Sequence, residues 1–316
     1  MTKLLISLAA LLALAAPAIA QEEAAAPSPG EIVAQAPAEE WITIPSEDLL
    51  VMTLAPAADG SERKVVIQLM PAPFSQGWVE NIRTLARAQW YDGITVNRVQ
   101  DNYVVQWGDS NYDNPEAEGA AKPLPKGLRV MNEADYISDK VGQALAMEDV
   151  EIDEDPYADS TFFHQGWAVG GDTDGAWPVH CYGMAGVGRG RSPDAGSGAE
   201  LYTVIGHAPR HLDRNIALVG RIVEGMEHLS SLPRGAGALG FYTAEEAGKR
   251  TPILSVRVAS DLPESEQPAF EYLSTGGDSF ARYADARANR RDPFFIHPAG
   301  GADICNIPVP VRRVGD

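Results

Sequence analysis

Short stretches of this chain alternate hydrophobic with polar residues, and this alternation predicts β-strands. The first two predicted strands cover residues 49–54 and 64–70, with a turn at Asp59-Gly60 between them. Further strands are predicted over later runs of the same kind: residues 162–169, 179–185, 201–206, 216–223 and 253–259. So many short strands with few helical stretches favour a closed or sandwich-like β-architecture.

Helical periodicity occurs in few places. Trp78, Ile82 and Leu85 recur at helical spacing behind Ser75, which can cap a helix. Near the end of the chain, residues 264–273 and 278–291 predict two short amphipathic helices. We therefore expect a mainly β domain followed by a small helical extension.

The stretch ITVNRVQDNYVVQWGD, residues 94–109, predicts a β-hairpin that turns at Asp101-Asn102. Ile94, Val96 and Arg98 lie two apart, so on a regular strand they share one face. A permanently charged guanidinium is unexpected there, and Gln106 adds a polar group on the returning strand. Its simplest interpretation is an arginine whose stem packs at a sheet edge while its head reaches water.

The first forty residues differ from the rest of the chain. Lys3, an apolar stretch over residues 4–15 and Ala18-Ile19-Ala20 have the features of a cleavable signal peptide. The apolar stretch is shorter than the ~20 residues of a membrane-spanning helix, although an uncleaved anchor is the alternative. We expect an exported protein, periplasmic where the cell has two membranes. Residues 21–40, rich in Ala, Pro and Glu, predict a disordered linker.

Composition excludes some classes of function. The net charge is −19 at pH 7, whereas nucleic-acid binding needs basic patches that displace counterions. Cys181 and Cys305 are the two cysteines, and in an exported protein they suggest one disulfide, with two reduced thiols as the alternative. They match no zinc spacing, and Pro209 between His207 and His211 argues against a helical metal pair. We expect no metal site.

Three further motifs fit no familiar chemistry. The acidic run at residues 147–159 lacks the glycine and terminal glutamate of a calcium-binding loop, so we expect a solvated face of an insertion over about residues 110–160. The glycine-rich residues 183–191 match neither a dinucleotide nor a phosphate-binding fingerprint. Ala195 occupies the first glycine position of a nucleophile elbow around Ser197, so that motif is not one.

Taken together, blocks of the sequence resemble the cyclophilin family of peptidyl-prolyl isomerases. The family's opening pattern is matched by the following residues: Ala72-Pro73, Asn81-Ile82, Leu85 and Tyr91-Asp92-Gly93. Its Phe-His-Arg-Val…Gln-Gly-Gly-Asp signature resembles VNRVQDNYVVQWGD, and its Ser-Met-Ala strand resembles YGMAG. Its Gly-Ser-Gln-Phe-Phe run is blurred into GAELY, and its closing block resembles LDRNIALVGRIVEGM. The blocks follow in the family's order across residues 64–260.

This resemblance implies an eight-stranded antiparallel β-barrel capped by two helices, with a ligand groove on its outside. We expect the cyclophilin-like domain to span residues 41–260, and residues 261–316 to form an extension packed on the barrel. Arg98 and Gln106 would be the catalytic residues of the groove. The positions that would bind substrate are Tyr103, Val104, Met184, Ala185, Gly186, Glu200, Tyr202, His211 and Leu212.

The implied reaction is the rotation of an X–Pro peptide bond, and it needs no cofactor. A guanidinium aimed at the prolyl nitrogen binds the twisted amide better than either planar form. The expected partners are proline-containing or unfolded exported polypeptides, and a monomer is favoured. Some family positions are altered: Asn97, Val104, Trp107, Glu200, His211 and Ile216. A binding module without turnover is therefore the main alternative, and an unrelated ligand-binding barrel is a third.

Overall fold

The computed structural model describes residues 25–111, 117, 119–138, 151–152 and 155–315. The predicted signal peptide at residues 1–20 and much of the acidic run at residues 147–159 lie outside these residues. In the described part of the chain, no helix is long and apolar enough to cross a membrane.

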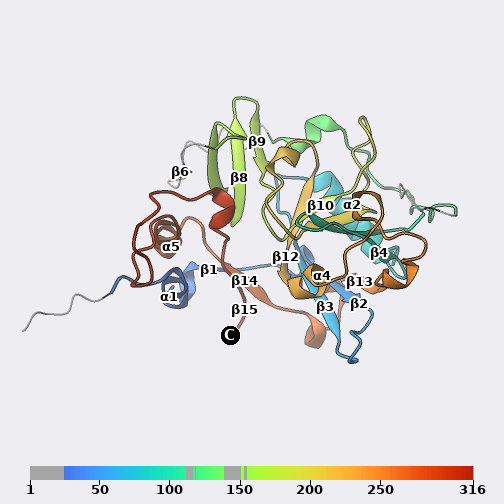
Figure 1. The fold of residues 1–316 in the computed structure, drawn as a ribbon, viewed down its shortest axis with the longest axis horizontal. Coiled ribbons are helices and arrows are strands. Elements are labelled where there is room, and N and C mark those ends of the chain that lie inside the picture. Colours follow the sequence, from blue (N-terminus) through green and yellow to red (C-terminus); the bar gives the residue numbers. More distant parts are fainter. Residues whose placement is uncertain (1–24, 112–116, 118, 139–150, 153–154, 316) are drawn as a thin grey trace, which may run out of the picture.

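Eight antiparallel strands form the main sheet, in the order β13-β2-β3-β12-β10-β11-β5-β4 (Figure 1). Their bounds are β2 Leu49–Leu54, β3 Arg63–Leu69, β4 Thr95–Val99, β5 Val104–Gly108, β10 Met184–Val187, β11 Leu201–Val204, β12 Leu218–Glu224 and β13 Ile253–Val258. The two outer strands meet, because the amide of Val96 donates to the carbonyl of Thr251 at 2.9 Å and that of Ile253 to Ile94 at 2.8 Å. The sheet is thus nearly closed, and the predicted β-barrel is confirmed.

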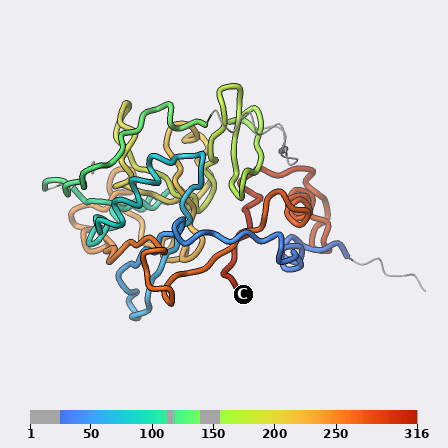
Figure 2. Tube along the Cα trace, turned by 180° about the vertical axis from the view of Figure 1, so that it is seen from behind, coloured from blue at the N-terminus to red at the C-terminus, as the bar shows by residue number. Residues whose placement is uncertain are grey.

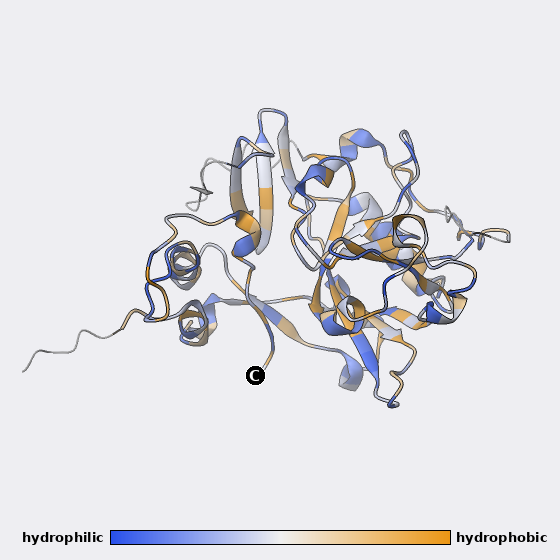
Figure 3. Ribbon diagram, viewed as in Figure 1, coloured by the Kyte–Doolittle hydropathy of each residue, from blue (hydrophilic) through white to orange (hydrophobic). Residues whose placement is uncertain are grey.

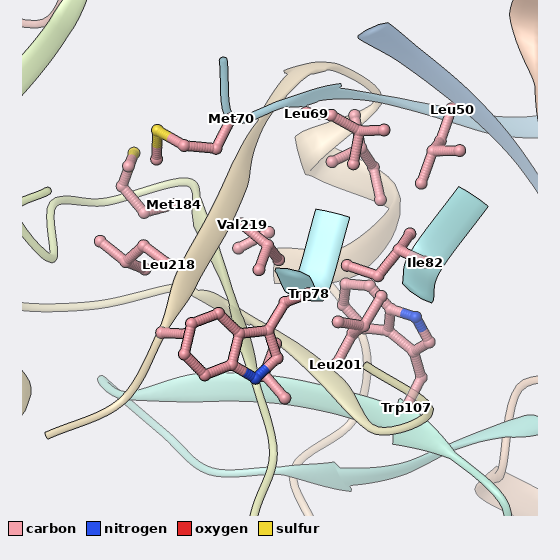
Figure 4. Close-up of a cluster of buried hydrophobic side chains, with 14 of the residues drawn as sticks. Leu50, Leu69, Met70, Trp78, Ile82, Trp107, Met184, Leu201, Leu218 and Val219 are labelled. Carbon is pink, nitrogen blue, oxygen red and sulfur yellow. The ribbon is translucent and has the colours of Figure 1, made fainter. Parts of the chain in front are cut away.

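The barrel interior is apolar because alternate strand residues point inward. Figure 3 shows apolar and polar residues mixed along these strands, as expected when one face covers a core. Helix α2, Gln76–Arg87, packs against β12 and β13, and α4, Met226–Ser230, packs against β3. Figure 4 shows Trp78 and Ile82 of α2 among core residues such as Trp107 and Val219. These are the two helices that the resemblance implies.

A second antiparallel sheet is built entirely from residues between β5 and β10. Its strands are β6 Glu151–Ile152, β7 Ser160–His164, β8 Trp167–Asp172 and β9 Gly175–Pro178. The segment foreign to the barrel therefore extends beyond residue 160, to the end of β9. The single strand predicted over residues 162–169 is wrong, because β7 and β8 form a hairpin that turns at Gln165-Gly166, both in the left-handed backbone region.

A third sheet joins the two ends of the chain. It consists of β1 Trp41–Thr43, β14 Phe270–Leu273 and β15 Val311–Arg313, with β14 in the centre. The helix predicted over residues 264–273 is wrong: a short 3-10 turn, Glu264–Glu266, precedes β14. The backbone of Phe270–Leu273 pairs with strands on both sides, and this long-range pairing overrides the local helical pattern.

Two helices lie beside this sheet. Helix α5, Asp278–Ala288, confirms the second predicted C-terminal helix and packs against α1, Pro29–Ala34 (Figure 2). The described residues of the predicted linker, 25–40, are thus not disordered. Ser28 caps α1 through a reciprocal capping box with Glu31, and Ile32 is 4% exposed.

The C-terminal extension is attached to the barrel by packing and by a covalent bond. Phe270 shares an apolar cluster with Leu49, Val51 and Val66 of the barrel strands. A disulfide joins Cys181, just before β10, to Cys305 in the extension. The domain boundary at residue 260 stays a prediction.

Candidate active site

A row of side chains crosses the outer face of three neighbouring strands. Arg98 on β4 pairs with Gln106 on β5, and Gln106 pairs with Tyr202 on β11. The next strand, β10, contributes Gly186 opposite Tyr202. Residues on either side of this row, such as Val105 and Trp107, point into the core instead. Cross-strand pairing therefore places a cation, an amide and a phenol side by side.

A β-bulge determines which way Arg98 points. Between Val96 and Arg98 the register with β5 shifts by one residue, so that Asn97 is the extra residue. Val96 pairs with Trp107 and is buried in the core, whereas Arg98 pairs with Gln106 on the outer face. The expectation that Val96 and Arg98 share one face is therefore wrong, because the bulge breaks the alternation between them.

The row lies in a cavity of about 320 Å³. It is lined by the predicted residues Arg98, Tyr103, Val104, Gln106, Tyr202 and Leu212 and by the additional residues Gly188, Arg189, Ile216, Leu239 and Phe241. Except for the two arginines and Gln106, the lining consists of apolar and aromatic side chains and one glycine. Such a cavity suits an apolar ring with a polar group beside the guanidinium.

The guanidinium of Arg98 is held by acceptors from three segments. Its Nε donates to the carbonyl of Leu239 at 2.7 Å, its Nη1 donates to Oε1 of Gln106 at 3.1 Å, and its Nη2 donates to Gln100. Its carbon lies 5.6 Å from the ring centre of Tyr103 and 5.5 Å from that of Phe241. Burial lowers the pKa of Arg98 from its usual range. The simple interpretation of a sheet-edge arginine with its head in water is therefore wrong.

Leu239 and Phe241 are pocket residues that sequence reasoning missed. They belong to a loop more than a hundred residues after Arg98, and Phe241 forms an isolated β-bridge with Arg98. Leu239 is 65% exposed and its φ is 55°, in the left-handed region that non-glycine residues rarely adopt. No local pattern in the sequence links this loop to β4.

Tyr202 forms a wall of the cavity and is tied to a buried histidine. Its Oη lies 2.8 Å from Nε2 of His180, and His180 Nδ1 lies 2.8 Å from Oδ1 of Asp213. Burial raises the pKa of Tyr202 well above 10, so the phenol keeps its proton. The carboxylate of Asp213 can only accept, so Nδ1 of His180 donates to it, and Nε2 of His180 shares a hydrogen bond with the phenol. His180 and Asp213 were not among the predicted site residues.

Several predicted substrate-binding residues do not line the cavity. Met184 and Ala185 are buried in the barrel core. Gly186 lies beneath Tyr202: a Cβ on Gly186 would come within 2.3 Å of the phenol oxygen. Glu200 is buried and accepts a hydrogen bond from the amide of Asp109 at 2.8 Å.

His211 lies at the edge of the site. Its ring stacks on Tyr103, with 6.3 Å between the ring centres and an angle of 8° between the planes. Tyr103 itself lines the cavity, so His211 supports a wall without forming one.

Comparison with known protein families identifies the family of this chain. Residues 61–258 match the family model described as cyclophilin type peptidyl-prolyl cis-trans isomerase/CLD. A crystal structure of a cyclophilin from Hirschia baltica is similar in fold, with a TM-score of 0.62 at 20% identity, covering 87% of this chain and 94% of that one. A cyclophilin-type isomerase from Cryptosporidium parvum, determined in the presence of the dipeptide ala-pro, gives a TM-score of 0.36 at 10% identity, covering 66% of this chain and 98% of that one. No curated protein sequence matches the chain.

Proposed function

The chain belongs to the cyclophilin-type family of peptidyl-prolyl cis-trans isomerases, and we propose that its outer cavity is where it rotates X–Pro peptide bonds. The assignment of this activity to the cavity rests on one observation. Arg98 is fixed at the edge of an apolar pocket by Gln106, Gln100 and the carbonyl of Leu239. A cation held by three hydrogen bonds beside an apolar pocket can act on one atom of a bound proline.

The chemistry requires stabilisation of a twisted amide. Rotation of an X–Pro bond costs about 18–20 kcal/mol because amide resonance is lost at the perpendicular geometry. The prolyl nitrogen then carries a lone pair that the planar amide lacks. Arg98 uses three of its five N–H donors within the protein, so two remain to donate to that lone pair. A fixed donor that meets charge only in the transition state lowers the barrier.

The remaining pocket residues hold the substrate. Val104, Leu212 and Ile216 would surround the proline ring with apolar surface, with Tyr202 as the aromatic wall. Gln106 accepts from Arg98 through its carbonyl oxygen, which leaves its amide group to donate to the substrate backbone. The signal-peptide features of residues 1–20 support exported polypeptides as the clients, with the periplasm as the compartment.

A peptide isomerisation assay at micromolar protein tests the proposal. The wild type should accelerate interconversion of a proline-containing peptide, and Arg98→Ala should lower kcat/KM at least tenfold, which corresponds to about 1.4 kcal/mol of transition-state stabilisation. Peptide binding should change much less, because the planar ground state gains little from this donor. Arg98→Lys should also have a low kcat/KM, since an ammonium lacks the planar arrangement of donors.

Arg63→Ala is the matched control. Arg63 also donates its Nε to a backbone carbonyl, that of Ala55 at 2.6 Å, but it lies outside the cavity. This variant should keep wild-type turnover. Near-wild-type turnover by Arg98→Ala would remove the mechanism, and peptide binding without turnover by the wild type would favour a binding module instead.

A further inference from the structure

A continuous chain of hydrogen bonds runs from the cavity to the inserted segment. Tyr202 contacts His180, and His180 contacts Asp213, as described above. Oδ2 of Asp213 accepts from Nε of Arg210 at 2.6 Å. Arg210 then donates Nη1 and Nη2 to the two carboxylate oxygens of Asp155, at 2.6 and 2.9 Å. The chain thus begins at a pocket wall and ends in the segment between β5 and β10.

Each member of this chain is buried, so each needs the next one. His180 is 0% exposed, and the side chains of Arg210, Asp213 and Asp155 are between 3% and 5% exposed. A buried charge without a partner is strongly unfavourable. Asp155 belongs to the acidic run that the sequence predicts as a solvated face, and for this residue the prediction is wrong. The carboxylate of Asp155 accepts from both Nη atoms of Arg210.

The same network fixes a second wall of the cavity. Leu212 ends the short 3-10 helix that begins at Arg210, Asp213 follows as its C-cap, and Leu212 lines the cavity. Arg210 is held from outside by Asp155, with the ring of Tyr157 5.2 Å from its guanidinium carbon. Tyr202 on β11 and Leu212 on this helix therefore share one buried anchor.

We propose that Asp155 is a positioning residue for the proline pocket, acting through Arg210, Asp213 and His180 on Leu212 and Tyr202. This inference rests on the proposed function of the cavity. It gives the inserted segment a role: it supplies the carboxylate that holds two pocket walls at the spacing a proline ring needs. Asp155 does not line the cavity and would touch no substrate.

The expected effect on KM and kcat follows from the contacts that the proline ring makes with the pocket walls. The proline ring contacts the walls equally in the planar and the twisted amide, so loosening the walls weakens ground-state and transition-state binding together. Such a change raises KM and leaves kcat unchanged. A loss of folded protein alone would instead lower the apparent kcat.

The experiment compares Asp155→Asn with a matched control in the full-length mature chain. Asp155→Asn keeps the side-chain size and removes the charge. Asp92→Asn removes the same charge from another bidentate pair, with Arg257 at 2.8 and 2.7 Å, on residues outside the cavity. Turnover of a proline-containing peptide and its Kd, from NMR titration, are measured well below the midpoint of thermal unfolding.

We expect Asp155→Asn to raise KM and Kd at least fivefold with kcat within twofold of wild type, and Asp92→Asn to change neither. Tyr202→Phe, which keeps the ring and removes the link, should also raise KM. The double variant Asp155→Asn, Tyr202→Phe should raise KM by less than the product of the two single-variant effects. Arg210→Lys, which keeps the charge but loses the fork, should show the Asp155→Asn pattern and serves if that variant does not fold.

Either of two results overturns the positioning role. One is a KM for folded Asp155→Asn within twofold of wild type; the other is a double variant whose effect equals the full product. Failure of the proposed function is separate: a wild type that binds the peptide without turning it over removes the isomerase assignment, while the Kd series still decides the role of Asp155. A wild type that does not bind the peptide overturns both.

Discussion

Replacement of Arg210 by methionine should destabilise the protein far more than its single charge suggests. Arg210 is 3% exposed and makes hydrogen bonds of 2.6, 2.6 and 2.9 Å to Asp213 and Asp155. Methionine fills most of the volume but leaves two buried carboxylates without a cation. Breaking a buried ion pair by removing one partner costs about 3–5 kcal/mol. Because total stabilities are typically ~5–15 kcal/mol, this is a large share.

Urea unfolding followed by tryptophan fluorescence measures the effect. In thermal unfolding the same loss of stability should lower Tm by roughly 6–20 °C, at about 2–4 °C per kcal/mol for a domain of this size. The matched control is Arg257→Met, whose pair with Asp92 has similar distances but side chains 27% and 29% exposed. Water can solvate the orphaned Asp92, so the loss there should be about 0–1 kcal/mol.

A second variant separates lost attraction from stranded charge. The triple replacement Asp155→Asn, Arg210→Met and Asp213→Asn leaves no charge in the network, and it should recover most of the stability that Arg210→Met loses. A loss below about 1 kcal/mol in Arg210→Met, or a triple variant no more stable than the single one, would refute the reasoning.

Two further predictions concern pH and export. Burial raises the pKa of Tyr242 to about 12, so the folded protein keeps a proton that the unfolded chain releases near pH 10. The stability that this difference contributes is complete below pH 10 and is lost as pH rises toward 12. Urea midpoints measured between about pH 9 and 11.5 should therefore fall more steeply for wild type than for Tyr242→Phe. Parallel slopes would contradict that assignment. Mass spectrometry of the exported protein should find a chain that starts at Gln21, and an exported form starting at Met1 would contradict the predicted cleavage.

The sequence predicts well those features that depend on local order and motif blocks. Most barrel strands, α2 and α5 follow from periodicity, but the strand predicted over residues 179–185 is wrong over most of its length, because β10 covers Met184–Val187. Pocket residues on the β4–β5 hairpin were found because Arg98, Tyr103 and Gln106 are neighbours in a recognisable block. Even there the bulge at Asn97 was missed, since an extra residue in one strand leaves no mark on the alternation until the partner's register is known.

Features that depend on distant partners could not be predicted in this way. The strand Phe270–Leu273 forms because β1 and β15 are available on either side of it. Asp155 looks like one more acid in a solvated run, and only its contact with Arg210, fifty-five residues later, makes it a buried ion. By contrast, helix α1 could have been predicted from the capping box of Ser28 and Glu31. The Ala- and Pro-rich composition around it led to the prediction of a disordered linker instead.

The positions at which this chain departs from the family pattern can be judged by what an isomerase pocket needs. Asn97 is buried and donates from Nδ2 to the carbonyl of Gly108 at 3.0 Å, while Trp107 is a core residue, so both support the hairpin from behind. Val104 and Ile216 do line the cavity, and both keep it apolar.

Stabilising a twisted amide requires a fixed cation, a grip on the ring and little competing water. None of these altered positions supplies the cation, and the two in the cavity preserve the grip. We therefore expect turnover that depends on Arg98 to survive these departures.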